Sequence, residues 1–329
     1  MYILQFIIGL VAIVKGADWL TDGAASVACR FGIPTLVVGL TIVAMGSSAP
    51  ELVVSVVSAL QGKVDIALGN VVGSNIFNTL AIMGITAMVC PIAVERGNIR
   101  NDVPFTVLAS VAVAITALDA FFNGTGSENV ISRSDGLLLL CLFAIFMSYT
   151  MSIAKGDKGR AEALTSEEAQ PAAATEEGVM PVWKSVIMIL TGLAGLVLGG
   201  NWFVGGAAGL AAMMGISQSI IALTIVSAGT SAPELAASVM AARKGDTAMA
   251  LGNVVGSNVF NVFFVLGTAA TIHPLGVGGI TYFDICALLI SSVMLWTLCK
   301  FGKTHYTLTR VEGGLLALMA VAYYVVRCM

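Results

Sequence analysis

Residues 46–84 read GSSAPELVVSVVSALQGKVDIALGNVVGSNIFNTLAIMG, and residues 229–267 read GTSAPELAASVMAARKGDTAMALGNVVGSNVFNVFFVLG. The two stretches align without a gap at an offset of 183, and 22 of the 39 positions are identical. Each stretch holds a proline, a glutamate and several hydroxyl and amide side chains inside otherwise apolar sequence. A duplicated set of oxygen ligands at membrane depth predicts a site for ion translocation.

The rest of the chain has the composition of a membrane protein. Of its 329 residues, 57% are hydrophobic and 11% are charged, whereas soluble domains carry about 25% charged residues. A spanning helix needs about 20 mostly apolar residues. Ten such segments are predicted, at residues 2–23, 35–60, 65–90, 103–122, 135–154, 182–204, 217–242, 247–272, 281–299 and 312–328. The expected fold class is therefore an all-α integral membrane protein with ten transmembrane helices.

The offset of 183 reaches beyond the two motifs, since it also relates Gly16 to Gly199 and Trp19 to Trp202. The repeat then covers the first three helices of each half. Five helices per half is an odd number, so the second half inserts upside down. Two inverted-topology repeats of five helices are typical of secondary transporters, whose sites lie where the repeats meet. The expected domains are an N-terminal repeat at 1–154 with its motif at 39–84, a linker at 155–180, and a C-terminal repeat at 181–329 with its motif at 222–267.

The placement of basic residues predicts the orientation in the membrane. Alternate connections, starting with the one after the first helix, hold 12 of the 16 lysines and arginines. Cytoplasmic connections carry the excess of basic residues. We therefore expect a multi-pass protein of the plasma (inner) membrane with both termini outside. The 155–180 segment is polar and charge-mixed, which indicates a mobile cytoplasmic linker.

The proline in each motif predicts a break in its helix. Pro50 has no N–H, so the carbonyl of Gly46 loses its helical partner, and Pro233 does the same to Gly229. Ser48 and Glu51 have capping-box spacing, as do the corresponding residues of the second motif. We therefore expect each helix to stop and restart here, which directs backbone dipoles at the gap.

Glu51 and Glu234 fall midway through their predicted spans, where a charge costs several kcal/mol unless a cation compensates it. Ser74 and Asn78 are four residues apart and share a helix face, as do Ser257 and Asn261. These side chains are expected to reach the two glutamates. Two carboxylates with neutral oxygens suit Ca²⁺, which takes about 6–8 oxygen ligands, and Na⁺ fits the same kind of cage. Neither Cys nor His lies near, which argues against Zn²⁺ or Cu⁺.

The paired stretches GSSAPE…GNVVGSNIFN and GTSAPE…GNVVGSNVFN resemble the two alpha-repeats of the sodium/calcium exchangers, in the cation/Ca²⁺ antiporter superfamily, most closely the small prokaryotic type. The resemblance covers the whole chain. It implies four cation sites between the second, third, seventh and eighth helices. The ligands it implies are Glu51, Glu234, Asn78, Asn261, Ser47, Ser48, Thr230, Ser231, Ser74, Ser257, and the carbonyls of Ala44 and Ser227.

Two positions depart from the family pattern. Ser47 stands where many relatives have Thr, and both central positions are Asn, whereas some relatives have an Asp at one. A less negative site leaves the ion stoichiometry and proton coupling open.

The leading functional prediction is an antiporter that exchanges Ca²⁺ for Na⁺ by alternating access. The alternatives are a Ca²⁺/H⁺ antiporter that uses the same glutamates, a K⁺-dependent Na⁺/Ca²⁺ exchanger, a passive Ca²⁺ channel, and a membrane-embedded enzyme. The chain has no nucleophile–His pair or metal triad, so an enzyme is not expected. The expected partners are Ca²⁺, Na⁺ and the lipid bilayer, with H⁺ or K⁺ left open. No cofactor, nucleic acid or protein partner is implied.

Overall fold

The computed structural model describes residues 1–62, 64–124, 129–154, 180–214, 227–277, 279–302 and 306–328. The expected linker at 155–180, apart from Met180, lies outside the described residues. So does the first part of the predicted span 217–242.

The first half of the chain is almost entirely helical. Its elements are α1 (Tyr2–Phe31), α2 (Thr35–Val38), the π-helical turn η1 (Gly39–Val43), α3 (Ala44–Ser47), α4 (Ala49–Leu60), α5 (Val64–Phe77), the π-helical turn η2 (Asn78–Ile82), α6 (Met83–Val89), β1 (Ile92–Ala93), α7 (Arg96–Asn101), α8 (Val103–Ala117), α9 (Asp119–Asn123), β2 (Val130–Ile131) and α10 (Arg133–Ala154).

The second half follows a similar order. Its elements are α12 (Val182–Met213), α14 (Ser227–Thr230), α15 (Ala232–Arg243), α16 (Thr247–Val259), the π-helical turn η5 (Phe260–Leu266), α17 (Gly267–Ile272), β3 (Leu275–Gly276), α18 (Tyr282–Phe301), β4 (Thr307–Leu308) and α19 (Arg310–Cys328). The two-residue strands pair antiparallel across the halves, β1 with β4 and β2 with β3.

The protein is an all-helical membrane protein. In lipid, only helices and closed barrels satisfy every backbone polar group internally. Seven helices in the described parts are long and apolar enough to cross a bilayer, or eight if a bent pair counts as one span. The prediction of ten spans stays a prediction. Helix α15 is 12 residues long by itself, which is shorter than a spanning helix needs.

The expected break in the first motif is confirmed. The run Thr35–Ser47 and the run Ala49–Leu60 meet at an angle of 48°. The break falls at Ser48, whose ψ of 10° is not helical, and Pro50 opens the next helix. Proline fits the first turn of a helix because the N–H it lacks has no intrahelical acceptor there. Ser231 has the same conformation ahead of α15, with ψ of 8°.

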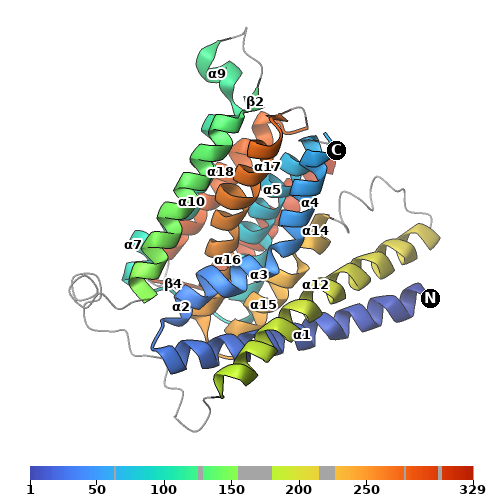
Figure 1. The fold of residues 1–329 in the computed structure, drawn as a ribbon, viewed down its shortest axis with the longest axis vertical. Coiled ribbons are helices and arrows are strands. Elements are labelled where there is room, and N and C mark those ends of the chain that lie inside the picture. The colour runs from blue at the N-terminus through green and yellow to red at the C-terminus, as the bar shows by residue number, and fades with distance from the viewer. Residues whose placement is uncertain are drawn as a thin grey trace.

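Two helical runs form the centre of the molecule (Figure 1). They are α5–η2–α6 and α16–η5–α17, whose most apolar windows are 78% and 94% buried, against 28% for α1. Their side chains make up nearly half of the main hydrophobic core. The central position of these runs places the second part of each motif away from lipid.

Helices α1 and α12 lie side by side and cross the rest of the bundle obliquely (Figure 1). Glycines bring their backbones together, since a Cβ on Gly16 would lie 2.7 Å from the carbonyl oxygen of Gly192. A Cβ on Gly23 would lie 2.8 Å from the carbonyl oxygen of Ser185. Small residues permit such close helix packing in membranes.

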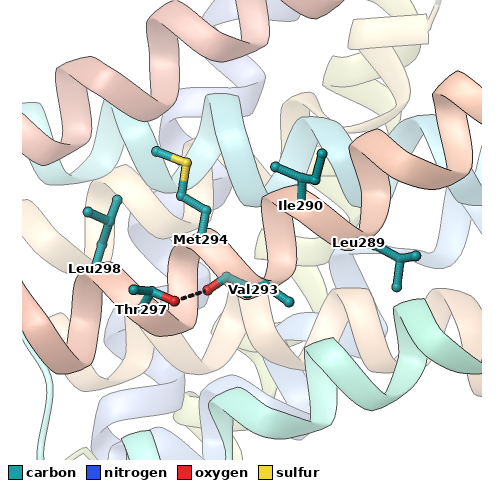
Figure 2. Close-up of a pocket in the computed structure, with 6 residues that line it drawn as sticks. All are labelled: Leu289, Ile290, Val293, Met294, Thr297 and Leu298. Atoms are coloured by element: carbon teal, nitrogen blue, oxygen red, sulfur yellow. Dashed lines mark hydrogen bonds between the residues drawn. The ribbon is translucent and has the colours of Figure 1, made fainter.

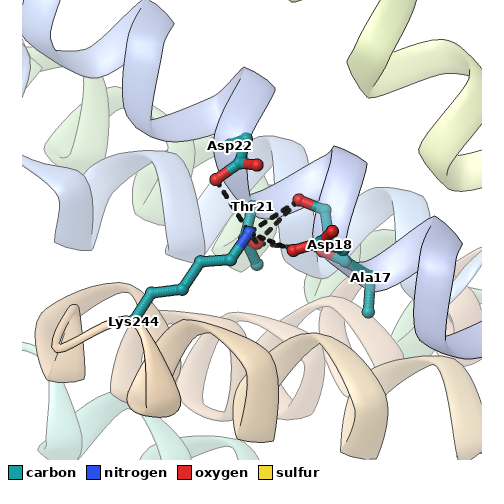
Figure 3. Close-up of polar contacts among 5 residues, drawn as sticks. All are labelled: Ala17, Asp18, Thr21, Asp22 and Lys244. Atoms are coloured by element: carbon teal, nitrogen blue, oxygen red, sulfur yellow. Dashed lines mark hydrogen bonds and ion pairs between the residues drawn. The ribbon is translucent and has the colours of Figure 1, made fainter. Parts of the chain in front are cut away.

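One ion-pair cluster attaches α1 to the end of α15 (Figure 3). The Nζ atom of Lys244 lies 2.6 Å from the carboxylate of Asp18 and 2.7 Å from that of Asp22. It also donates to the carbonyl of Asp18 and to the hydroxyl of Thr21. Two acids one turn apart on α1 therefore share a single cation.

Candidate functional site

The two glutamates lie in the first turns of α4 and α15, directly after the helix breaks. Both Glu51 and Glu234 are 0% exposed. A helix N-terminus favours negative charge because its first N–H groups have no intrahelical acceptors. The two motifs therefore bury one carboxylate each at a site that is electrostatically suited to hold it.

Each glutamate is bonded by a serine of the other motif. The hydroxyl of Ser48 donates to Oε1 of Glu234 at 2.7 Å, and the hydroxyl of Ser231 donates to Oε1 of Glu51 at 3.3 Å. The expected capping boxes are wrong, because neither serine makes a capping bond from its side chain. The hydroxyls turn to the opposite carboxylate, since a charge-assisted bond is stronger than a neutral one.

The carbonyls at the first break are used differently from the prediction. The Gly46 carbonyl is not free, because it accepts a backbone N–H at the end of α3. The Ala44 carbonyl accepts the N–H of Ser48 at 3.0 Å and the hydroxyl of Ser47 at 3.3 Å. An ion that binds the Ala44 carbonyl must therefore displace the Ser47 hydroxyl or share the oxygen with it.

The asparagines at the centre of each motif lie where the helix widens into a π-helical turn. Asn78 begins η2, and Asn261 is the second residue of η5. Both are buried, at 1% and 0% exposed. π-Helical turns inside α-helices occur frequently at functional sites. The same irregularity at both asparagines indicates a shared role.

Several buried polar atoms of the site have no hydrogen-bond partner within the described part of the chain. The oxygens among them are Oε2 of Glu51, Oε2 of Glu234, Oδ1 of Asn78, Oδ1 of Asn261 and Oγ of Ser257. Leaving a buried polar group unpaired costs about 1–3 kcal/mol, and more for a charged group. A cation bound among these oxygens removes that penalty. The donor set of two carboxylates with amide and hydroxyl oxygens is the one that hard cations prefer.

The remaining candidate ligands are placed less completely. Ser47 and Ser74 are buried. Thr230 is half-buried at the end of α14, and Ser227 is the first residue of that helix. No group of three His, Cys, Asp or Glu side chains converges within the described residues. The carboxylates available to a cation at this site are therefore those of Glu51 and Glu234.

The motifs contain functional candidates that sequence reasoning missed. The side chains of Asn70 and Asn253 donate to the backbone carbonyls of Glu51 and Glu234, at 3.2 and 3.1 Å. Their identity in both copies was the available signal. The contact itself depends on how α4 crosses α5 and how α15 crosses α16.

A second missed pair joins the two central runs. The side chain of Asn75 donates to the carbonyl of Asn258 at 3.0 Å, and Asn258 donates to the hydroxyl of Thr79 at 2.8 Å. Asn75 and Asn258 are 183 residues apart, so the same position of each motif meets its counterpart. These bonds join α5–η2 to α16.

A surface hollow lies away from these residues. It has a volume of about 370 Å³ and follows one face of α18 (Figure 2), lined by Leu289, Ile290, Val293, Met294, Thr297 and Leu298. Its one hydroxyl, that of Thr297, is bonded to the Val293 carbonyl of its own helix. An apolar hollow of this kind offers no ligand to an ion.

The chain is similar to proteins of known class along its whole length. The family described as "Sodium/calcium exchanger protein" matches residues 1–152 and 184–329. CaxA of Alkalimonas amylolytica is 36% identical over 322 residues, which are 96% of this chain and 95% of CaxA. The sodium/calcium exchanger MaX1 of Methanosarcina acetivorans is 30% identical over 342 residues, covering 98% of this chain and 97% of MaX1. The structure of the sodium-calcium exchanger NCX_Mj soaked with 10 mM Na⁺ superposes with a TM-score of 0.79 at 28% identity, covering 99% of this chain and 98% of that one.

Proposed function

Because the chain belongs to the sodium/calcium exchanger protein family, we propose that Glu51 and Glu234 are the carboxylates for which Ca²⁺ and Na⁺ compete. The protein is an antiporter that exchanges Ca²⁺ for Na⁺ across a membrane. The observation that carries the assignment of the site is that the Oε2 atoms of both glutamates are buried and have no hydrogen-bond partner in the described part of the chain.

The charge of the site explains the coupling. Two ionised carboxylates carry two negative charges, which one Ca²⁺ or two Na⁺ neutralise. Both ions use the same oxygens, so Ca²⁺ and Na⁺ cannot occupy them together. Exchange follows because release of one ion leaves two buried charges that only another cation can compensate.

Neutral ligands complete the cage around these carboxylates. Amide oxygens come from Asn78 and Asn261, and hydroxyls come from the motif serines and Thr230. The list in full is Ser47, Ser48, Ser74, Thr230, Ser231 and Ser257, with the carbonyls of Ala44 and Ser227. Ser48 and Ser231 bond the Oε1 atoms of the two carboxylates, so these serines orient each glutamate and leave its Oε2 atom for the cation.

The topology that fits this function is ten transmembrane helices in two inverted repeats, 1–154 and 181–329. The protein lies in the plasma (inner) membrane. Both termini are outside, and the 155–180 linker is in the cytoplasm. Access alternates as α1 and α12 slide together across the other helices. The glycine contacts between these two helices support their movement as one unit.

The test is flux into liposomes that contain the purified protein. An outward Na⁺ gradient drives ⁴⁵Ca²⁺ uptake in the wild type, and separate H⁺ and K⁺ gradients show whether either ion is coupled. E51Q and E234Q abolish the Na⁺-driven uptake, since each removes a charge that Ca²⁺ requires. E312Q is the matched control, because Glu312 is also a buried acid but bonds Thr309 at the start of α19. Gradient-driven uptake that survives in both E51Q and E234Q refutes the assignment.

A further inference from the structure

Two asparagines hold the helical turns that follow the glutamates. The Nδ2 atom of Asn253 donates to the carbonyl of Glu234 at 3.1 Å and to the hydroxyl of Ser238 at 2.8 Å. The Nδ2 atom of Asn70 donates to the carbonyl of Glu51 at 3.2 Å and to the hydroxyl of Ser55 at 3.0 Å. The side-chain amide nitrogen of asparagine carries two hydrogens. Each asparagine donates both of them to one turn of the helix that carries the glutamate.

This pattern fixes the helix that carries the carboxylate. Glu234 and Ser238 are four residues apart and lie one above the other on the same face. A shift of α15 by one residue moves the helix about 1.5 Å along its axis and about 100° around it, and either movement breaks both bonds. The two-point attachment therefore sets the direction in which the glutamate side chain leaves the helix.

Asn253 has a third bond that reaches the other motif. Its Oδ1 atom accepts from the hydroxyl of Ser47 at 3.3 Å, and that hydroxyl shares its one hydrogen with the carbonyl of Ala44. The next residue, Ser48, donates to the carboxylate of Glu234. Asn253 therefore bonds the backbone carbonyl of Glu234, and Ser48 bonds its carboxylate. The bond from Ser47 to Asn253 joins these two contacts, because Ser47 and Ser48 are neighbours in the chain.

We propose that Asn70 and Asn253 are positioning residues, which aim the carboxylates of Glu51 and Glu234 into the cage without binding an ion themselves. The inference rests on the proposed function of the two glutamates. Asn253 is 1% exposed and its amide hydrogens are both committed. Because the ions share the glutamates, the loss of either asparagine weakens the binding of both Ca²⁺ and Na⁺.

The experiment measures half-saturating Ca²⁺ and Na⁺ concentrations and maximal exchange rate in liposomes for N253A, N70A and S238A. N253A removes both bonds to the glutamate helix, each at the low end of the range for a neutral hydrogen bond, so it raises both half-saturating concentrations about five- to tenfold. S238A, which removes one of the bonds, raises both about two- to threefold. The maximal rate per folded protein stays within about twofold of the wild type in each case.

A double-mutant cycle measures half-saturation, which does not change if the asparagine has a purely structural role. S238A added to N253A causes no further change in half-saturation, because the bond they share is already lost. N129A is the matched control. The side chain of Asn129 also bonds a backbone group, the N–H of Ala120, but in the connection before β2. N129A leaves both half-saturating concentrations unchanged.

The possible results separate cleanly. A change in Na⁺ half-saturation alone makes the asparagine a sodium ligand and overturns the proposal. Reduced protein yield with unchanged half-saturation makes it a packing residue and also overturns it. If N253A does not fold, S238A and S55A decide the question by the same readouts. If E51Q and E234Q still exchange, the proposed function itself fails, whereas essential glutamates with unaltered half-saturation in N253A and S238A refute only the positioning role.

Discussion

Ser48 and Glu234 are 186 residues apart in the chain, yet the hydroxyl of Ser48 donates a 2.7 Å hydrogen bond to the carboxylate of Glu234. The reciprocal bond, from Ser231 to Glu51, is longer at 3.3 Å. Each motif therefore supplies the serine for the glutamate of the other, and the two bonds differ in strength. These two bonds link the two motifs directly.

The unequal lengths of these bonds predict unequal effects of mutation. A hydrogen bond to a charged group is worth about 1.5–3 kcal/mol, so S48A raises half-saturating Ca²⁺ on the order of tenfold or more. S231A raises it less, about threefold, because its bond is longer and weaker. Calcium titration of exchange in liposomes measures both. T191A is the control, since the hydroxyl of the exposed Thr191 donates to the carbonyls of Ile187 and Met188 in its own helix. Equal effects of S48A and S231A contradict the ranking.

The contact between α1 and α12 predicts a cost for any added side chain. A Cβ on Gly16 would lie 2.7 Å from the Gly192 carbonyl oxygen and 2.8 Å from the backbone nitrogen of Leu196. Backbone atoms cannot rotate away, so G16A forces the helices apart and destabilises the protein by about 1–3 kcal/mol. The measurement is the apparent melting temperature in detergent, with the exchange rate alongside. G314A serves as the control, because the nearest atom to its Cβ is the Met88 sulfur at 3.8 Å. A melting temperature for G16A equal to that of G314A contradicts the prediction.

The Lys244 cluster predicts a small, salt-dependent contribution to stability. The side chains of Lys244 and Asp18 are 29% and 33% exposed, so solvent screens their attraction. Pairs of this kind are worth about 0–1 kcal/mol. K244A lowers the melting temperature slightly in dilute buffer, and the difference from wild type shrinks at high salt. K184A, at an exposed lysine of α12, shows no such salt dependence. A loss for K244A that is the same at all salt concentrations argues that packing, not charge, is responsible.

The carboxyl of Asp246, which lies outside the predicted spans, makes the stability of the protein depend on pH. Burial raises the pKa of this carboxyl above 3.8, while bonds from the Met249 N–H and the Thr35 hydroxyl oppose the rise. A carboxyl with a raised pKa in the folded state favours folding fully below its unfolded pKa, and this contribution is lost as pH rises through the folded pKa. Asn also caps helices well, so D246N keeps the bonds without the charge. The difference in melting temperature between D246N and the wild type therefore shifts in favour of D246N as pH rises from about 4. A constant difference across that range contradicts the prediction.

The helical segments and the break in the first motif could be predicted from the sequence because their causes are local. Apolar runs of sufficient length form helices in lipid wherever they occur. Pro50 interrupts its helix through its own missing N–H, and the structure places the break two residues before it, at Ser48.

The bonds within the site could not be predicted in the same way. Ser48 has the spacing of a capping residue relative to Glu51, and only the tertiary structure presents it with the Glu234 carboxylate as a stronger acceptor. Asn70 and Asn253 are visible in both motifs, but the carbonyls they bond are 19 residues away. Their partners depend on how neighbouring helices cross.

The sequence alone determined which chemical groups this protein carries into the membrane: two glutamates, their serines and their asparagines, each written twice at an offset of 183. Tertiary structure decided which of these groups meet, by laying α4 beside α5, α15 beside α16, and Ser48 against Glu234. The division has a physical basis. Hydropathy and proline act within a few residues of the chain, whereas a hydrogen bond between side chains requires atoms within about 3.5 Å, and only the packing of whole helices brings distant residues that close.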